Sequence, residues 1–313
     1  MKFYQAPLEG ITGSIFRTTI HEVFGDAIDT YFTPFLTPHI KCFLSAKEEE
    51  DVHPDHNIGM HTVPQILTNS AEGFLVLVDG LHNELGYNEV NFNLGCPSKT
   101  VTGKGRGSGF LGRPIELARF LDAVFEKCPC AISVKTRIGD TDAEEFRDLL
   151  SLFNRFPIKE LIVHPRIRTE AYRGSAHREW FSYALQESRN PLCYNGDITS
   201  PADLEIVKDL FDKEGRDYNV MIGRGLIADP SLIRQLKGGA SMTPDELERF
   251  LSLLLTRYRA VMPGEIPTLY KMKEVWSYMG RLFPAQQKTV KKLLKAKSIP
   301  EYKIEEQTII KSI

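Results

Sequence analysis

Short apolar runs alternate with longer amphipathic stretches along most of the chain. Eight runs rich in apolar and β-branched residues predict strands, near 3–6, 28–35, 62–67, 89–94, 131–136, 160–164, 191–195 and 218–223. Stretches with helical spacing follow most of them, at 71–85, 114–125, 143–153, 201–211 and 230–236. Strands that alternate with helices pair in parallel, because each crossover returns the chain to the same end of the sheet.

Eight strand–helix units within residues 1–242 predict an α/β fold, a (β/α)8 TIM barrel. An open doubly wound sheet is the alternative, although that fold usually has fewer strands and a glycine fingerprint after the first. Gly107, Gly109 and Gly112 do spell a G-x-G-x-x-G pattern. A dozen residues separate it from the preceding strand, however, and a dinucleotide fingerprint lies in the turn directly after one.

The strand pattern stops before Thr243, and helices are predicted at 244–261, 268–283 and 284–296. We therefore expect two domains, a catalytic barrel at 1–242 and an all-helical domain at 243–313. The net charge changes sign at the same boundary. Residues 243–313 carry 13 Lys or Arg and 8 Asp or Glu, net +5, whereas residues 1–242 carry 26 and 33, net −7. A basic appendage on an acidic body indicates a polyanionic partner such as RNA.

The last predicted helix is rich in lysine. Its basic side chains spread around more than one face, at Lys288, Lys291, Lys292 and Lys295. A solvated helix face is the ordinary interpretation of such a run, and contact with an RNA backbone is the alternative.

Candidate site residues, most of them polar, lie at or directly after the ends of most predicted strands. They are Pro7, Leu8 and Glu9 after the first strand, then Gln65, Asn93 with Cys96, Lys135, His164, the run Asn195, Gly196 and Asp197, and finally Gly223 with Arg224. In a barrel the carboxyl ends of the strands form one face, which is the face where active sites lie. Any one of these residues alone is better explained by structure, but seven convergent sets are not.

Two groups of these residues indicate a cofactor. Gly196 and Gly223 expose backbone N–H groups where this fold commonly holds a phosphate, and Arg224 adds charge-assisted hydrogen bonds. Lys135 and His164 suit an anionic or hydrogen-bonding ring system. A phosphate-binding site beside hydrogen-bond donors for a ring system is what flavin mononucleotide (FMN) requires.

Cys96 lies where the fourth strand breaks into a glycine-rich loop that carries Lys99 and Lys104. A thiol at this position beside cations indicates a reactive group next to an anionic partner, although an inert packing cysteine is the alternative. The five cysteines have no regular framework and fit a reducing cytoplasm. No membrane-spanning run or signal-peptide layout is evident, and nothing implies a partner protein.

His53, His56 and His61 crowd one polar loop. Few carboxylates stand near them at ligand spacing, so a solvent-exposed loop is the better explanation and we predict no metal site.

Several motifs in this order resemble those of bacterial, flavin-dependent tRNA-dihydrouridine synthases. They are APLEG at 6–10, NLGCPSKTV at 93–101, SVKTRIG at 133–139, HPR at 164–166, NGD at 195–197 and MIGRG at 221–225, with Trp276 in the C-terminal region. The resemblance spans nearly the whole chain. It implies an FMN-binding barrel with a helical tRNA-binding domain, in which NADPH reduces the flavin and uridine in the tRNA D-loop loses its C5–C6 double bond. By the same resemblance Cys96 protonates C5, and Asn93 and Arg178 hold the uracil.

The chain departs from the family pattern at a few positions. Leu8 stands where methionine is frequent, and Asn91 stands where aspartate is common. The Cys96 segment resembles one bacterial subgroup and residues 176–179 another, so the modified uridine is left open.

Two other functions compete with this interpretation. A flavin barrel that acts on a free pyrimidine, such as a dihydropyrimidine or dihydroorotate dehydrogenase, has no need of a basic helical region. An RNA-binding module on a barrel scaffold has no need of Cys96 or Lys135.

Overall fold

The computed structural model describes residues 1–312, except for the side chain of Asp26. Within these residues eight parallel strands close into a barrel in chain order, with β8 paired to β1. The strands are β1 (Phe3–Gln5), β2 (Thr30–Leu36), β3 (Thr62–Ile66), β4 (Glu89–Leu94), β5 (Ala131–Gly139), β6 (Leu161–Ile167), β7 (Leu192–Tyr194) and β8 (Tyr218–Ile222). The predicted TIM barrel is confirmed, and the open sheet was wrong.

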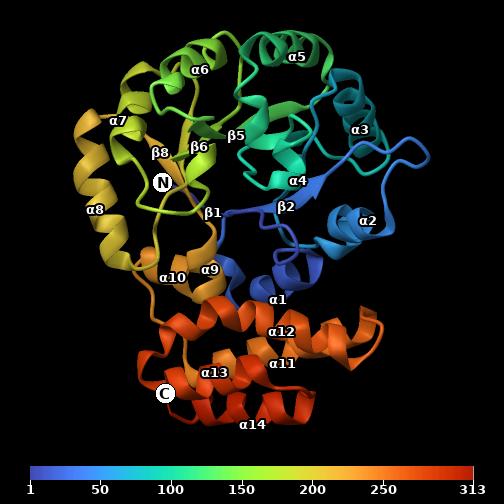
Figure 1. Ribbon diagram of the computed structural model, residues 1–313, viewed down its shortest axis with the longest axis vertical. Helices are drawn as coiled ribbons and strands as arrows, with labels where there is room; N and C mark the ends of the chain where they lie inside the picture. The colour runs from blue at the N-terminus through green and yellow to red at the C-terminus, as the bar shows by residue number, and fades with distance from the viewer. Residues whose placement is uncertain (313) are drawn as a thin grey trace.

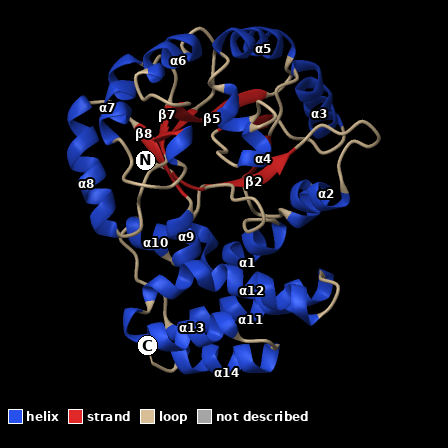
Figure 2. Ribbon diagram, in the orientation of Figure 1, coloured by secondary structure: helices blue, strands red, loops and turns tan. Residues whose placement is uncertain are grey.

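Helices surround the strands, as Figure 2 shows. They are α1 (Ser14–Phe24), α2 (Ala46–Val52), α3 (Ala71–Asn83), α4 (Lys99–Thr102), α5 (Pro114–Lys127), α6 (Glu145–Phe153), α7 (Arg178–Glu187), α8 (Pro201–Phe211), α9 (Arg224–Ala228) and α10 (Leu232–Leu236). The stretch predicted at 230–236 is the shorter α10, and a separate α9 precedes it. Asp229 and Pro230 break the two apart, because the residue before a proline avoids helical backbone angles.

The sequence prediction did not include α1. Its buried side chains Phe16, Ile20 and Phe24 recur every four residues, which is helical spacing. The polar and β-branched residues between them masked this period, because Thr18, Thr19 and His21 favour helices only weakly.

The barrel has two apolar layers. The larger layer lies between the strands and the surrounding helices. The interior is filled by a small cluster made of Tyr4, Ala6, Phe32, Val63, Ile162, Cys193 and Met221. Side chains two residues further along the strands point the same way, since the side-chain period of a strand is two. Gln65 and His164, two residues after Val63 and Ile162, therefore lie above this interior cluster, at the carboxyl end of the barrel. Lys135 lines the same cavity.

The C-terminal region is helical, at α11 (Pro244–Val261), α12 (Glu265–Met279), α13 (Gln287–Lys295) and α14 (Ile299–Ile310). The last of these was missed, although Ser298 caps its first turn by accepting from the N–H of Glu301. The buried Trp276 holds α12 to α14, because its indole N–H donates to the hydroxyl of Tyr302 at 2.8 Å.

The helical region packs against the barrel beside α1 and α9, below the strands in Figure 1. The rings of Phe16 and Phe250 meet edge to face at 5.9 Å, and Arg257 donates to Thr19 at 2.9 Å. The described strands all precede α11, but α11 and α12 share buried surface with the barrel. The domain division at residue 242 stays a prediction. None of the described helices has the length and apolar character needed to cross a membrane.

Candidate active site

A cavity of about 430 Å³ opens at the carboxyl ends of the strands. Its lining includes the residues predicted from the first strand and from the third to the sixth, namely Pro7, Leu8, Glu9, Gln65, Asn93, Cys96, Lys135 and His164. The structure therefore brings these predicted residues together from five different strands or the loops that follow them.

Two further spaces continue from this cavity toward β7 and β8. A narrow one of about 60 Å³ runs from Lys135 and His164 to the remaining predicted group, Asn195, Gly196, Gly223 and Arg224. It leads to a space of about 420 Å³ that includes Asp197 and is bordered by Arg281 of the helical region. Tyr172 lines all three spaces, which form one elongated site.

The backbone around Cys96 is held in place by hydrogen bonds. Asn93 Oδ1 accepts from the N–H groups of Gly95 and Cys96, each at 3.0 Å. The carbonyl of Cys96 accepts from the N–H of Ser108 at 3.1 Å and from its hydroxyl at 2.8 Å. The glycine-rich loop thus folds back as α4 and the short 3₁₀ helix η3 (Gly107–Phe110) and closes on the cysteine.

The Cys96 thiol is protonated at neutral pH. Burial raises its pKa above the ordinary value, while the Ser98 N–H and the cations Arg137 and Lys135 oppose that rise. The thiol therefore suits a proton donor better than a thiolate nucleophile.

Burial, together with the neighbouring cation Arg137, lowers the pKa of Lys135 to about 8. Burial also lowers the pKa of His164 well below its usual value, with help from Arg137 and other cations. Because Arg166 Nη1 lies 3.0 Å from His164 Nε2 and must donate, Nε2 is the acceptor. His164 is therefore neutral and carries its proton on Nδ1.

Asp197 balances part of this positive charge. It accepts from Arg166 at 3.0 and 2.5 Å and from Arg224 at 3.1 Å. Burial alone would raise the pKa of Asp197, but these bonds lower it. Asp197 thus holds Arg224 beside Gly223, at the wall that the narrow space shares with the larger one.

Tyr172, Glu274 and Tyr278 also line the site and were not predicted from the sequence. Tyr172 follows Ala171, whose φ of 53° lies in the left-handed region that alanine rarely adopts. Its ring meets the guanidinium of Arg224 at 4.5 Å and that of Arg137 at 5.4 Å. Glu274 and Tyr278 come from α12, and no local signal could have placed a C-terminal helix at the mouth of the barrel.

Other predicted site residues lie outside the cavities. Arg178 begins α7, near the buried Tyr194, and does not line any of the three spaces. The predicted RNA-contacting lysines are exposed and have no ion pair within the described residues; they are Lys99 and Lys104 near the cysteine and Lys288, Lys291, Lys292 and Lys295 on α13. In Figure 1, α13 lies further from the barrel than α12 does.

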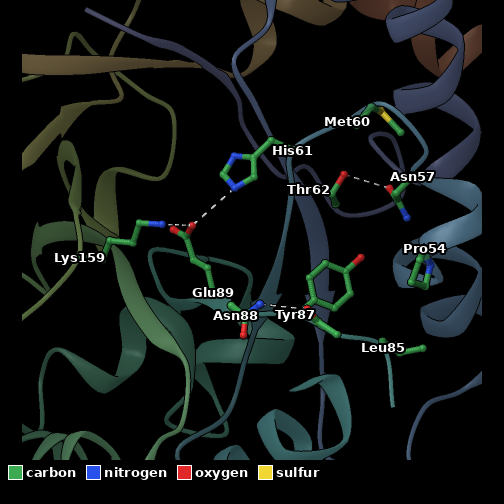
Figure 3. A pocket seen from close by; sticks show the side chains of 11 residues that line it. Pro54, Asn57, Met60, His61, Thr62, Leu85, Tyr87, Asn88, Glu89 and Lys159 are labelled. Atoms are coloured by element: carbon green, nitrogen blue, oxygen red, sulfur yellow. Dashed lines mark hydrogen bonds and ion pairs between the residues drawn. The ribbon is translucent and has the colours of Figure 1, made fainter. Parts of the chain in front are cut away.

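A separate cavity of about 390 Å³ lies at the opposite end of the barrel, beside the histidine loop. Figure 3 shows His61 and Lys159 reaching the same carboxylate, that of Glu89. His53 and His56 pack ring to ring at 5.6 Å instead. The described residues contain no group of three or more possible metal ligands, and the absence of a metal stays a prediction.

Comparison with known proteins agrees with the resemblance in sequence. The family described as dihydrouridine synthase (Dus) matches residues 4–308. The probable tRNA-dihydrouridine synthase 2 of Bacillus subtilis (strain 168) is 32% identical over 241 residues, 73% of this chain and 70% of that protein. The probable tRNA-dihydrouridine synthase of Staphylococcus aureus (strain N315) is 27% identical, covering 96% and 90%. The tRNA-dihydrouridine(16) synthase of Cupriavidus necator (strain H16) is 27% identical, covering 90% and 89%. This chain belongs to the dihydrouridine synthase family.

Proposed function

We propose that this protein reduces the C5–C6 double bond of uridine in the D-loop of tRNA, with bound FMN as cofactor and NADPH as the source of electrons. The observation that carries the proposal is the elongated site, which joins a protonated thiol at one end to an arginine-lined space at the other. Membership of the dihydrouridine synthase family supports the reaction. Since its substrate is tRNA, the reaction would take place in the cytoplasm.

The residues present fit FMN. The ring end of the site offers side-chain amides of Gln65 and Asn93 together with the Lys135 ammonium and the His164 imidazole. At the other end a Cβ on Gly223 would stand 3.6 Å from Ala6 and Leu8, at the wall of the narrow space. The glycine thus leaves room for a ligand chain to pass toward the guanidinium of Arg224, which suits a phosphate.

Bound flavin would supply a hydride to C6 of the uracil. The residues of the chain then have two tasks. Lys135 and His164 orient the ring system through their N–H groups, because Nδ1 of His164 carries its proton. Cys96 supplies the second hydrogen as a proton to C5, and its raised pKa keeps the thiol protonated at neutral pH.

The target base must leave its stack to reach this cavity. Exposed lysines beside Cys96 and on α13 supply part of the attraction for the RNA backbone. Asn93 lines the cavity and is the proposed contact to the uracil. Arg178 lies outside the cavity and is proposed as a second contact, which forms only when bound tRNA brings the uracil to it. The position of α12 at the mouth also favours a macromolecular substrate over a free pyrimidine, since Glu274 and Tyr278 extend the site beyond the barrel.

The test uses purified protein, tRNA that lacks dihydrouridine, and NADPH. We expect heat denaturation to release FMN and we expect dihydrouridine to form in the tRNA, with no turnover of free uracil or dihydroorotate. Release of FAD, or of no flavin from freshly purified protein, would contradict the cofactor assignment. Turnover of the free pyrimidine but not of tRNA would establish the alternative dehydrogenase.

A further inference from the structure

A row of buried polar side chains crosses three strands directly beneath the cavity. Gln65 on β3 pairs in register with Asn91 on β4, and Asn91 pairs with Ser133 on β5. Asn93 lies two residues further along β4 on the same face. All four side chains are at most 6% exposed, so each polar group needs a partner within the protein.

Hydrogen bonds join these residues into a continuous chain, which we call the amide ladder (Gln65, Asn91, Asn93 and Ser133). Asn91 Nδ2 lies 2.9 Å from Ser133 Oγ, and Gln65 Nε2 lies 2.8 Å from Asn91 Oδ1. Asn93 Nδ2 lies 2.7 Å from Gln65 Oε1. Asn93 Oδ1 then accepts from the backbone at Cys96.

Backbone groups at both ends fix the direction of the ladder. The N–H groups of Gly95 and Cys96 can only donate, so the group of Asn93 that faces them must be its oxygen. At the far end, the Ser133 hydroxyl donates to the carbonyl of Val90 at 3.3 Å, which leaves Ser133 Oγ to accept from Asn91. The two ends demand the same orientation of every amide between them.

This direction determines what Asn93 offers to a ligand. One N–H of its amide is used by Gln65 and its oxygen by the backbone, so the free group at the cavity wall is the second N–H. A reversed amide would instead present an oxygen, which repels the carbonyl oxygens of uracil. When hydride adds to C6, negative charge grows on the base toward its carbonyl oxygen, and a preset donor stabilises that charge.

We propose that Asn91 and Ser133 are positioning residues that act through Gln65 to hold the Asn93 amide with its N–H toward a carbonyl oxygen of the bound uracil. This inference rests on the proposed function. Neither Asn91 nor Ser133 lines the cavity. Their effect reaches the substrate only through the amide ladder, and the same bonds steady the backbone that carries Cys96.

The main variant is Asn91→Leu, which keeps a branched side chain of similar size but removes the acceptor for Gln65. We expect pre-reduced enzyme to form dihydrouridine more slowly by about tenfold. Complete removal of one preset donor costs roughly 10²–10³-fold, but here the donor is misoriented and not removed. Reduction of the flavin by NADPH does not use the uracil, so we expect it to change less than the step with tRNA. Any change in it measures the contact of Gln65 with the flavin. Asn91→Asp keeps an acceptor toward Gln65 in either protonation state, so this variant restores the rate.

The matched control is Asn190→Leu. Asn190 is also a buried asparagine, and it lies outside the cavities. Its side-chain amide makes one hydrogen bond, from Nδ2 to the Phe153 carbonyl at 3.0 Å. Its replacement leaves the dihydrouridine rate unchanged. Ser133→Ala removes only the hydroxyl that accepts from Asn91, and we expect it to slow the same step. This variant tests the proposal if Asn91→Leu fails to fold.

A wild-type rate in folded Asn91→Leu, no recovery in Asn91→Asp, or an equal reduction in Asn190→Leu would overturn the proposal. If even the unaltered protein forms no dihydrouridine, the proposed function has failed, and alkylation of flavin-free protein by iodoacetamide still tests the ladder. Asn91→Leu then changes the alkylation rate of Cys96 and Asn91→Asp does not. Equal rates in all three proteins would overturn the ladder independently of the function.

Discussion

At the scale of single residues, the site depends on which groups carry protons. Cys96 is neutral because it is buried, and His164 is neutral because it is buried among cations. Burial and the neighbouring Arg137 likewise lower the pKa of Lys135, to about 8. One cavity therefore contains a proton donor (Cys96), a neutral imidazole that donates a hydrogen bond (His164) and an amine that loses its charge near pH 8 (Lys135).

The first prediction concerns Cys96 as the acid. Cys96→Ala keeps its flavin, its NADPH oxidation and its tRNA binding, but it forms dihydrouridine more slowly by roughly 10²–10⁴-fold, because one positioned proton donor is removed. Single-turnover oxidation of the pre-reduced enzyme by tRNA measures that step, and flavin reduction by NADPH is its control. If both half-reactions fall together, the thiol has a structural role instead. If neither falls, another group donates the proton.

The second prediction is the pH dependence of FMN binding to flavin-free protein. Lys135 has a pKa of about 8 in the protein alone, so its ammonium is largely present at pH 7 and largely absent at pH 9. A ligand that prefers the ammonium raises this pKa when it binds, and its affinity falls as the pH rises above about 8. Fluorescence titration from pH 7 to 9 measures the affinity. Lys135→Met should bind FMN more weakly at pH 7, and its affinity should not fall between pH 7 and 9. If the affinity of Lys135→Met still falls with pH, another group causes the pH dependence.

At the scale of elements, the loop after β4 is the part that most directly shapes the chemistry. Gly107 has a φ of 55°, and a Cβ there would meet the Cys96 carbonyl at 2.8 Å. Phe110 then anchors η3 on Phe120, with the rings 5.6 Å apart, and Phe120 stacks on Phe92 of β4 at 4.6 Å. The loop is therefore fixed to the strand that it follows.

The third prediction separates backbone strain from this close contact. Gly107→Ala and Gly215→Ala both force alanine into the left-handed region, at φ of 55° and 65°, and each should lower the free energy of unfolding by about 1–2 kcal/mol. A Cβ at Gly215 meets nothing within 4 Å, whereas one at Gly107 displaces Cys96. Only Gly107→Ala should therefore slow dihydrouridine formation. Equal activity of the two folded variants would show that the loop tolerates the displacement.

The strands and the residues that follow them could be predicted because each leaves a local pattern. Gln65, Lys135 and His164 each lie in a short apolar run, and barrel geometry brings such residues together whatever the exact register. The amide ladder left no such trace, since its bonds depend on side chains matched across three strands. Tyr172 and Tyr278 were missed for a related reason, because an irregular loop and a distant helix bring them to the cavity.

At the scale of the whole molecule, the helical region completes the site and carries a net positive charge. Its α12 lines the cavity mouth, and its α13 presents lysines to solvent. The barrel beneath is net negative, so RNA would be attracted mainly to one part of the surface. This arrangement suits a substrate that touches the helical region and the cavity together.

The fourth prediction tests the lysines of α13. Replacing Lys288, Lys291, Lys292 and Lys295 with alanine should weaken tRNA binding and flatten its salt dependence by roughly 0.7–0.9 in log–log slope for each phosphate that is no longer neutralised. Binding measured by filter retention between low and moderate salt gives the slope. The control compares Lys291→Ala/Lys292→Ala with Lys127→Ala/Lys213→Ala, which removes two exposed lysines from the barrel. If both pairs behave alike, or the quadruple variant keeps its affinity and slope, α13 is only a solvated face.

We conclude that this chain makes dihydrouridine in tRNA, and we propose Cys96 as the acid. The most direct measurement is the dihydrouridine content, by mass spectrometry, of tRNA from a strain that lacks all of its own dihydrouridine synthases and expresses this chain. We expect dihydrouridine at a D-loop position with the unaltered protein and very little with an equal amount of folded Cys96→Ala. No dihydrouridine with the unaltered protein, or the same content with both proteins, would contradict it.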